Sequence, residues 1–306
     1  MKKFFLFSCL MILVLGCSQN GKSQDLIIKQ IPIKNHVVYG INTSIQCRFD
    51  LLINDISAVN NSLGYATYDI NPYVLKNGKY KIKIKLHTKG IPQDILEKTR
   101  IHLVKYLKND EGEFVENSKE TIEELVFKLN FNKDSIIQEQ EWEVYIKELP
   151  YELEGWNKGQ DLRKLNQKDL EQKVMNYYKK VWSILNNGDG NMWSNLTQKR
   201  SYETAIFDYN SKEELERFMK ENEDVVSKKA KNMLIPLEDF EMKIYADGKL
   251  VTLERKAHTR DFNNSFPLDI KGWSPLIRKY STGGGSDYPI LLYLPEDSNE
   301  FVIIRK

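Results

Sequence analysis

The sequence contains few of the residues that carry enzyme and metal chemistry. Among 306 residues there are three cysteines and four histidines. None of the histidines has a second histidine, a cysteine or a carboxylate at the spacing of metal ligands. The catalytic signatures His-Glu-x-x-His, Gly-x-Ser-x-Gly and Ser-x-x-Lys are also missing. The sequence therefore predicts no metal site, no cofactor and no local catalytic set. The four histidines are His36, His87, His102 and His258.

An excess of charge of one sign is missing as well. The chain has 45 basic and 43 acidic residues, and loss of Lys2 and Lys3 with an N-terminal signal would make the two numbers equal. A protein that follows nucleic-acid phosphates needs a basic stripe. Attraction to an anionic membrane surface needs basic clusters too. We therefore predict no nucleic-acid partner, and membrane attachment, if present, through lipid.

Long hydrophobic runs are limited to the N-terminus. Residues 4–15 are almost all apolar and follow Lys2 and Lys3. The run is too short to cross a bilayer as a helix. A basic start, a short apolar segment and a small residue at the end of that segment are typical of a secretory signal. Residues 1–16 are therefore predicted to be a signal peptide.

The end of this signal carries the most informative motif of the chain. Residues 14–17, Val-Leu-Gly-Cys, resemble a bacterial lipobox. The resemblance implies cleavage between Gly16 and Cys17 and lipidation of Cys17, so membrane lipid is the first expected partner. Residues 17–24 then form a flexible tether. In Gram-negative bacteria Ser18, in place of aspartate, favours the outer membrane facing the periplasm. The alternative is an ordinary cleaved signal with an incidental cysteine.

Cysteine use excludes a disulfide framework. With Cys9 removed and Cys17 acylated, Cys47 is the one remaining thiol, so no intramolecular disulfide can form. The alternating residues Ile45, Cys47 and Phe49 indicate a strand with all three side chains on one face. Free cysteine is among the most buried residue types. We therefore expect Cys47 to be a core residue.

Residues 25–151 are predicted to form an antiparallel β-sandwich. Residues 26–33 are expected to be its first strand. Apolar residues and lysines alternate over residues 80–86, which predicts a strand with its lysines facing solvent. Further strand patterns occupy 101–107, 125–131 and 142–146. About seven short strands separated by turn signals are typical of this architecture. Residues 69–82 also resemble a strand-turn-strand segment that is common in Ig-like and carbohydrate-binding-like sandwiches.

Residues 152–167 are predicted to be a linker, after which the pattern becomes helical. An apolar stripe runs from Leu170 to Leu185 and stops at residues 186–188. A second helix is expected over 192–206. A third begins at Ser211, where Glu214 completes a capping box.

Strand patterns return after the helices, at residues 240–244, 250–255, 289–294 and 301–304. Helices followed by an antiparallel sheet predict an α+β domain over 168–306, and an α+β class for the whole chain. This order, together with residues 178–189 of the first helix, is similar to the cone-shaped NTF2-like fold.

Two features of the second domain are candidates for binding. Trp273 stands in an irregular stretch, where a core role is less automatic than on a helical stripe. Gly283, Gly284 and Gly285 lead into a strand rather than a helix, so a loop is favoured over a phosphate cradle. Loops on a rigid scaffold often carry contacts. Both features are therefore candidate binding residues, whereas core packing is the alternative for Trp273.

The lipobox, two compact modules and the missing catalytic set favour one function class. We expect a membrane-anchored lipoprotein of a bacterial envelope that acts as a binding or interaction module. The expected partner is a protein whose identity the sequence does not specify. Lipid-anchored immunity proteins, which neutralise a toxin, fit this profile.

Two other function classes stay open. A hydrolase or isomerase would use a pocket in the C-terminal domain, where Asp261, Asp269 and His258 are the first candidates for an acid–base pair. A glycan-binding lipoprotein would need an exposed aromatic platform on the β-domain, with Trp142 and Tyr73 as candidates.

Overall fold

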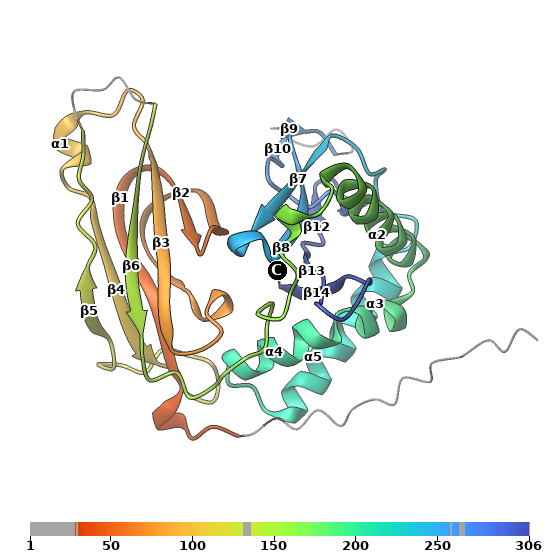
Figure 1. Ribbon diagram of the computed structural model, residues 1–306, viewed down its shortest axis with the longest axis horizontal. Coiled ribbons are helices and arrows are strands. Elements are labelled where there is room, and N and C mark those ends of the chain that lie inside the picture. Colours follow the sequence, from red (N-terminus) through yellow and green to blue (C-terminus); the bar gives the residue numbers. More distant parts are fainter. Residues whose placement is uncertain (1–27, 29, 131–135, 258, 263–266, 306) are drawn as a thin grey trace, which may run out of the picture.

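The computed structural model describes residues 28, 30–130, 136–257, 259–262 and 267–305. Two parts stand side by side, a β part at the left of Figure 1 and a part with helices and a second sheet at the right. We call them the β part (residues 33–146) and the α/β part (residues 167–305). The sheets are antiparallel. The predicted α+β class is therefore confirmed. No described helix is both long and apolar enough to cross a membrane.

One six-stranded sheet makes up the β part. Its order is β5-β4-β1-β3-β6, and β2 pairs with β1 beside this path. The strands are β1 (Val37–Ile53), β2 (Ile56–Asp69), β3 (Gly78–His87), β4 (Arg100–Leu107), β5 (Glu120–Glu124) and β6 (Ile137–Ile146). A one-turn helix α1 (Gln93–Leu96) and the 3-10 turns η1 (Ile33–Asn35) and η2 (Asn71–Tyr73) complete this part. The described residues of 26–33, predicted as a first strand, form no strand.

The long strand β1 curls the sheet around its main core. Residues 37–44 pair with β4, whereas residues 49–53 pair with β3, and the pairing with β2 is irregular between Ile45 and Phe49. Every second residue of β1, from Val37 to Ile53, is buried. Alternation of period two keeps one face of the strand on the core throughout. Cys47 lies on this face and is buried, as predicted.

The described residues of the predicted strand 125–131, namely 125–130, form no strand, and side chains explain what replaces it. β5 ends at Glu124. The chain beyond it bonds to side chains of β6 rather than to its backbone. The backbone N–H of Lys128 donates to Gln140 Oε1 (2.7 Å), and Gln140 Nε2 donates to the carbonyl of Val126 (2.9 Å). These bonds connect the chain after β5 to β6, and β5 and β6 are the strands at the two ends of the sheet order.

The outer face of β3 and β6 carries opposite charges in register. Lys79 lies 2.7 Å from Glu143, and Lys83 lies 3.0 Å from Glu141. The apolar residues of β3 are buried on the other face, so the predicted outward direction of its lysines is confirmed. Water screens exposed pairs of this kind, so each contributes little to stability.

The predicted linker, residues 152–167, packs between the two parts. Leu153 and Trp156 are buried. The Leu153 N–H donates to the Leu75 carbonyl of the β part (2.7 Å), whereas the Gln160 N–H donates to the Leu294 carbonyl of the α/β part (2.8 Å). The linker ends in the 3-10 turn η3 (Leu162–Lys164).

Four helices follow, and their ends carry the expected signals. They are α2 (Gln167–Asn187), α3 (Gly190–Leu196), α4 (Gln198–Phe207) and α5 (Lys212–Val225), which runs into the short π-helix η4 (Val226–Ala230). Helix α2 buries its predicted stripe and ends at Gly188, whose φ of 72° is the left-handed cap that favours glycine. The capping box of Ser211 and Glu214 is present. The predicted second helix is two helices, interrupted at Thr197.

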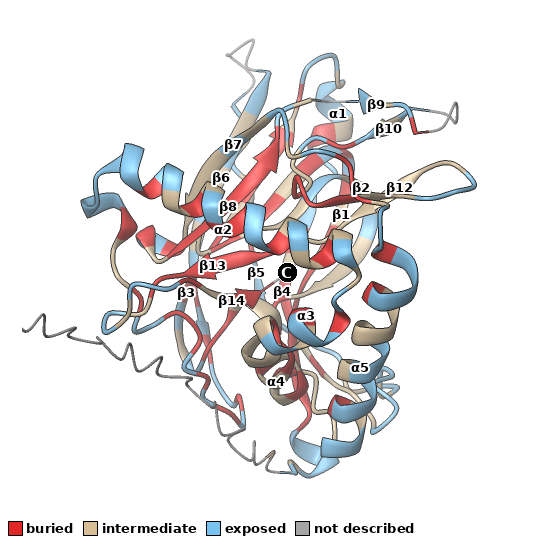
Figure 2. Ribbon diagram, turned by 90° about the vertical axis from the view of Figure 1, so that its right-hand side faces the viewer, coloured by how far each residue is buried: buried red, intermediate tan, exposed pale blue. Residues whose placement is uncertain are grey.

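The second sheet has the order β14-β13-β8-β7. Its strands are β7 (Phe240–Tyr245), β8 (Leu250–Arg255), β13 (Leu291–Tyr293) and β14 (Val302–Arg305), with the 3-10 turn η5 (Ala246–Gly248) between the first two. Two short hairpins, β9 (Thr259–Arg260) with β10 (Leu268–Asp269) and β11 (Ile277–Lys279) with β12 (Gly285–Asp287), lie between β8 and β13. Figure 2 shows the buried strands of this sheet behind helices that keep an exposed outer face.

The two parts share one hydrophobic cluster. Phe207, Leu250, Leu291 and Ile304 of the α/β part belong to the same buried cluster as the core face of β1. A second cluster lies between α2 and its sheet, where the Tyr178 hydroxyl is 3.0 Å from Thr252 Oγ1. Because this first cluster is continuous, the interface between the two parts is a hydrophobic core rather than a hydrated contact.

Candidate functional site

Some of the residues singled out by sequence lie outside the described residues. These are the lipidation and cleavage positions Cys17 and Gly16, the tether 18–24, and His258. The signal peptide and lipobox therefore stay predictions.

Trp273 and the glycine run lie close to one small cluster in the α/β part. Trp273 is half-buried against Ile270 and Ile277. Gly283 and Gly284 have φ values of 95° and 81° and form the turn between β11 and β12. A Cβ at Gly285 would lie 3.3 Å from the ring of Phe262, which belongs to the same cluster. The glycines thus serve a hairpin turn and close packing, and none of these residues lines the cavities described below.

The residues proposed for the two alternative functions are dispersed. Asp261 and Asp269 are exposed, and neither lines the two cavities described below. Trp142 is half-buried, packs edge-on against Phe127 at 5.9 Å, and donates through Nε1 to the Val126 carbonyl. Tyr73 is half-buried and borders a cavity, and burial raises the pKa of its hydroxyl. Trp142 and Tyr73 therefore form no exposed platform together.

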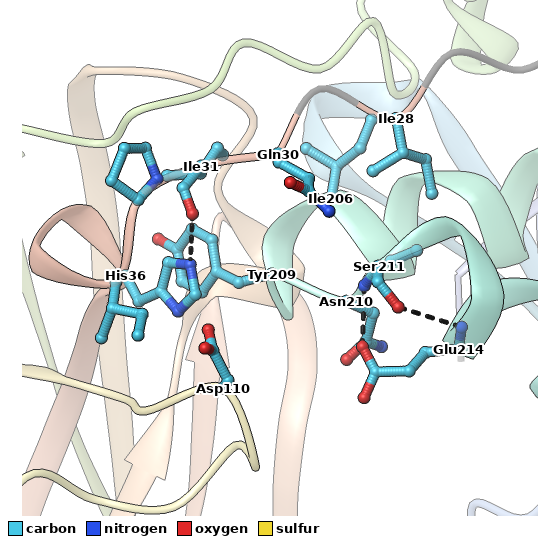
Figure 3. A pocket seen from close by; sticks show the side chains of 13 residues that line it. Ile28, Gln30, Ile31, His36, Asp110, Ile206, Tyr209, Asn210, Ser211 and Glu214 are labelled. Atoms are coloured by element: carbon cyan, nitrogen blue, oxygen red, sulfur yellow. Dashed lines mark hydrogen bonds between the residues drawn. The ribbon is translucent and has the colours of Figure 1, made fainter.

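The main candidate site is a cavity of about 570 Å³ where the two parts meet. Three segments that are distant in sequence enclose it: the chain entering β1, the loop between β4 and β5, and the junction of α4 and α5 (Figure 3). Ile31, Pro32, Ile33 and Ile206 supply apolar wall. Most of the remaining lining residues are polar, so the cavity combines apolar wall with groups able to hydrogen-bond a ligand.

His36 and Tyr209 stack at the centre of this site. Their rings are 4.5 Å apart between centroids and nearly parallel, with 4° between the planes. His36 is 2% exposed, and its Nε2 lies 2.7 Å from the Ile31 carbonyl oxygen. A carbonyl only accepts, so Nε2 carries the hydrogen and the neutral ring has an acceptor lone pair at Nδ1. This buried Nδ1 has no hydrogen-bond partner among the described residues.

Tyr209 occupies a backbone position that usually belongs to glycine. Its φ is 63°, and it follows Asp208 at the end of α4. The N–H of Asn210 donates to the Ala205 carbonyl (2.8 Å), and the N–H of Tyr209 donates to the Ile206 carbonyl (3.3 Å). This is a Schellman C-cap with tyrosine at the left-handed position, which costs roughly 1 kcal/mol relative to glycine. Backbone strain of this kind is concentrated at functional sites of proteins.

Contacts with the β part hold the Tyr209 ring in place. Its hydroxyl donates to the Val37 carbonyl at the start of β1. The ring also packs against the cluster of Val38, Val104 and Tyr106, and it lies 6.2 Å from the Tyr151 ring between centroids. Burial raises the pKa of the Tyr209 hydroxyl. The ring is therefore a neutral, fixed wall between the two parts.

Two carboxylates reach the same cavity from opposite sides. Asp110 is exposed on the loop after β4, and in Figure 3 it lies below the His36 ring, opposite Ile31. Glu214 comes from the first turn of α5, where its carboxylate accepts the N–H of Ser211 (2.7 Å). That backbone hydrogen bond holds the pKa of Glu214 below its usual value, so Glu214 is ionised at neutral pH. None of the described lining residues is lysine or arginine.

A second cavity, of about 340 Å³, lies on the other side of α4. Arg200, Arg305 and Asp208 line it together with Tyr73 and the half-exposed ring of Phe218. Burial raises the pKa of Asp208 to about 6 and lowers that of Arg200 to about 10. Charges of both signs line this cavity, so the lining favours neither a cationic nor an anionic ligand.

Sequence reasoning did not find the main site. His36 was noted only as a histidine without metal partners, and Tyr209 follows a helix whose end was predicted at Ile206. The capping box at Ser211 did locate the junction of α4 and α5. The sequence signal that could have indicated the site was Tyr209, a bulky residue between the end of a helix and the capping residue Ser211. The described residues hold no group of three or more histidine, cysteine or acidic side chains able to bind a metal ion.

The comparisons with known proteins give no further guide. No family model, no curated protein and no solved structure matches this chain.

Proposed function

We propose that this chain is a lipid-anchored protein of a bacterial envelope that works by binding another protein. The lipobox-like residues 14–17 carry this proposal, because they imply attachment through Cys17. The location proposed from Ser18 is the periplasmic face of the outer membrane in a Gram-negative host. Lipid at this position would hold the described part of the chain within reach of the membrane.

Features of the folded part support binding rather than chemistry. The cavity at His36 and Tyr209 joins elements of both parts and combines apolar wall with polar side chains that could bind a ligand. The carboxylates suggested for acid–base work, Asp261 and Asp269, are exposed. Within the binding class we propose an immunity-type role, in which the anchored protein captures a toxin in the envelope. A strain without the gene should then become sensitive to a toxin that the parent resists.

Crosslinking in living cells tests the proposed function. The full chain with a C-terminal tag is crosslinked, purified and analysed by mass spectrometry beside a Cys17→Ser variant. We expect acylation of Cys17 in the first sample, and one protein recovered near stoichiometry only when Cys17 is present. An unmodified Cys17 would refute the anchor, and an acylated chain that recovers no specific protein would refute the protein partner.

We propose two finer fold assignments on the same footing. The curled six-stranded sheet encloses the main core, which supports a sandwich-like interpretation of the β part. Four helices that precede a four-stranded antiparallel sheet support an NTF2-like interpretation of residues 168–306. An experimental structure superposed on members of each fold class would decide both assignments.

A further inference from the structure

We propose that the cavity at His36 and Tyr209 is a binding site for an alkylammonium group. The apolar chain of the ligand would lie against Ile31, Ile33 and Ile206, and its ammonium would face the carboxylates of Asp110 and Glu214. The ligand is either a free amine or the side chain of a lysine on a partner protein, since both present the same chemistry. This inference goes beyond the proposed function and does not depend on the lipid anchor.

The shape of the cavity suits a small apolar chain. Its volume, about 570 Å³, falls in the ordinary range for small-ligand sites. One wall comes from the chain before β1, and the facing wall comes from the last turn of α4 (Figure 3). The stacked rings of His36 and Tyr209 close the space between them. Hydrogen bonds to Ile31 and Val37 hold both rings in place, so the wall is formed before a ligand arrives.

The charge of the lining favours a cation over an anion or a neutral ligand. Glu214 is ionised, and Asp110 takes part in no ion pair within the described part of the chain. The cation Lys108, next to this loop, is already 2.9 Å from Asp69 Oδ2. A carboxylate or phosphate ligand would meet like charge at both Asp110 and Glu214. An ammonium would instead be attracted by both carboxylates.

The unpaired nitrogen of His36 supplies an independent observation. Nδ1 belongs to a side chain that is 2% exposed, and in the neutral ring it offers a lone pair. Buried polar atoms without a partner are uncommon and often mark a place for a ligand or a water. An ammonium is a donor with three hydrogens, so it can serve a carboxylate and a nitrogen acceptor together.

Calorimetric titration of the chain 18–306, which keeps every described residue, tests the proposal. The probes are butylammonium, butanol and butyrate at neutral pH. We expect butylammonium to bind with a Kd of about 1 mM, which is realistic for a ligand of this size. Butanol should bind more weakly, and butyrate should give no measurable binding. Equal binding of butanol and butylammonium, or tighter binding of butyrate, would overturn the proposal.

Variants assign the binding to this cavity. Asp110→Asn should weaken butylammonium binding roughly three- to fivefold and leave butanol unchanged, because it removes one partly solvated charge. Asp94→Asn, an exposed carboxylate on α1, is the matched control and should change neither. Ile206→Phe, which narrows the cavity, should weaken both ligands in a chain whose circular dichroism is unchanged. Binding that none of these variants affects would place the ligand elsewhere and refute the site.

A fourth probe distinguishes the two sources of the ammonium. Nα-acetyl-lysine methylamide presents a lysine side chain flanked by peptide groups, as a partner protein would. Binding of this probe at least as tight as that of butylammonium supports a lysine of a partner, whereas its exclusion supports a free amine. Neither result requires membrane or crosslinking, so failure here leaves the crosslinking experiment on the proposed function to be judged separately.

Discussion

Arg305 and Glu203 form a buried ion pair that joins the two parts of the molecule. Their side chains are 3% and 4% exposed, with Arg305 Nη1 2.8 Å from Glu203 Oε2. Arg305 Nε donates to the Pro72 carbonyl of the β part (2.8 Å), and Glu203 Oε1 accepts the Gly155 N–H of the linker (2.9 Å). One pair therefore connects η2, the linker, α4 and β14. The guanidinium also lies about 5.2 Å from the Trp156 and Phe207 rings.

Removing one member of this pair should be costly. Arg305→Met leaves the Glu203 carboxylate buried without its cation, and the expected loss in the free energy of unfolding is about 3–5 kcal/mol. The measurement is urea unfolding at neutral pH. Lys79→Met, which breaks the exposed pair with Glu143, is the control and should lower the free energy of unfolding far less. Similar losses in both variants would show that the buried pair contributes no more than a surface pair.

Asp208 should make the stability depend on pH. Burial is the main cause that raises its pKa to about 6, against an ordinary 3.8. The carboxyl therefore favours folding when protonated, and this contribution is present below about pH 4 and is lost as the pH rises through about 6. The full difference corresponds to roughly 3 kcal/mol. Asp208→Asn, which cannot ionise, should be about 2–3 kcal/mol more stable than the parent at pH 8 and equal to it at pH 4.

The comparison requires unfolding curves of both chains at several pH values, since other carboxyl groups titrate in the same range. Only the difference between the two chains reports Asp208. Asp94→Asn, at an exposed position on α1, should show no such difference. A constant difference between Asp208→Asn and the parent from pH 4 to 8 would show that Asp208 is ionised in the folded state throughout.

Substitutions of Tyr209 separate the cost of its left-handed backbone from the stabilisation that its ring provides. Tyr209→Ala removes the ring that stacks on His36 and should lower the free energy of unfolding by about 2–4 kcal/mol. Tyr209→Gly loses the same ring but relaxes the φ of 63°, so it should be about 1 kcal/mol more stable than the alanine variant. Tyr65→Ala, at a ring that is 74% exposed, should change the stability by less than about 0.5 kcal/mol. A glycine variant less stable than the alanine variant would exclude backbone strain at this position.

The predictable part of the fold is the part set by local rules. The stripe from Leu170 to Leu185, its end at Gly188 and the capping box at Ser211 depend on neighbours within a few residues, and the structure has all three. The alternation in β3 likewise placed its lysines on the outer face. Patterns of this kind report which face of an element is buried.

The missed part depends on residues far apart in sequence. The hairpin of β1 and β2 turns at Asn54 and Asp55, which adopt φ values of 47° and 63° without the glycine that marks such turns. The predicted strand at 125–131 has the right alternation, but the side chains of β6 take its hydrogen bonds. The stack of His36 on Tyr209 joins residues that are distant in the chain, so no local pattern announces it.

Cys47 should be inert in the folded protein. It is 2% exposed on the core face of β1, and burial raises the pKa of its thiol. Thiol reagents attack the thiolate, so both factors slow the reaction. In the chain 18–306, where Cys47 is the one thiol, a disulfide reagent should give no colour until denaturant unfolds the protein. Ser281→Cys, at an exposed position in the turn after β11, adds a matched thiol that should react at once. Rapid reaction of the parent chain at low denaturant would mean that β1 opens locally, because global unfolding is too rare to expose this face.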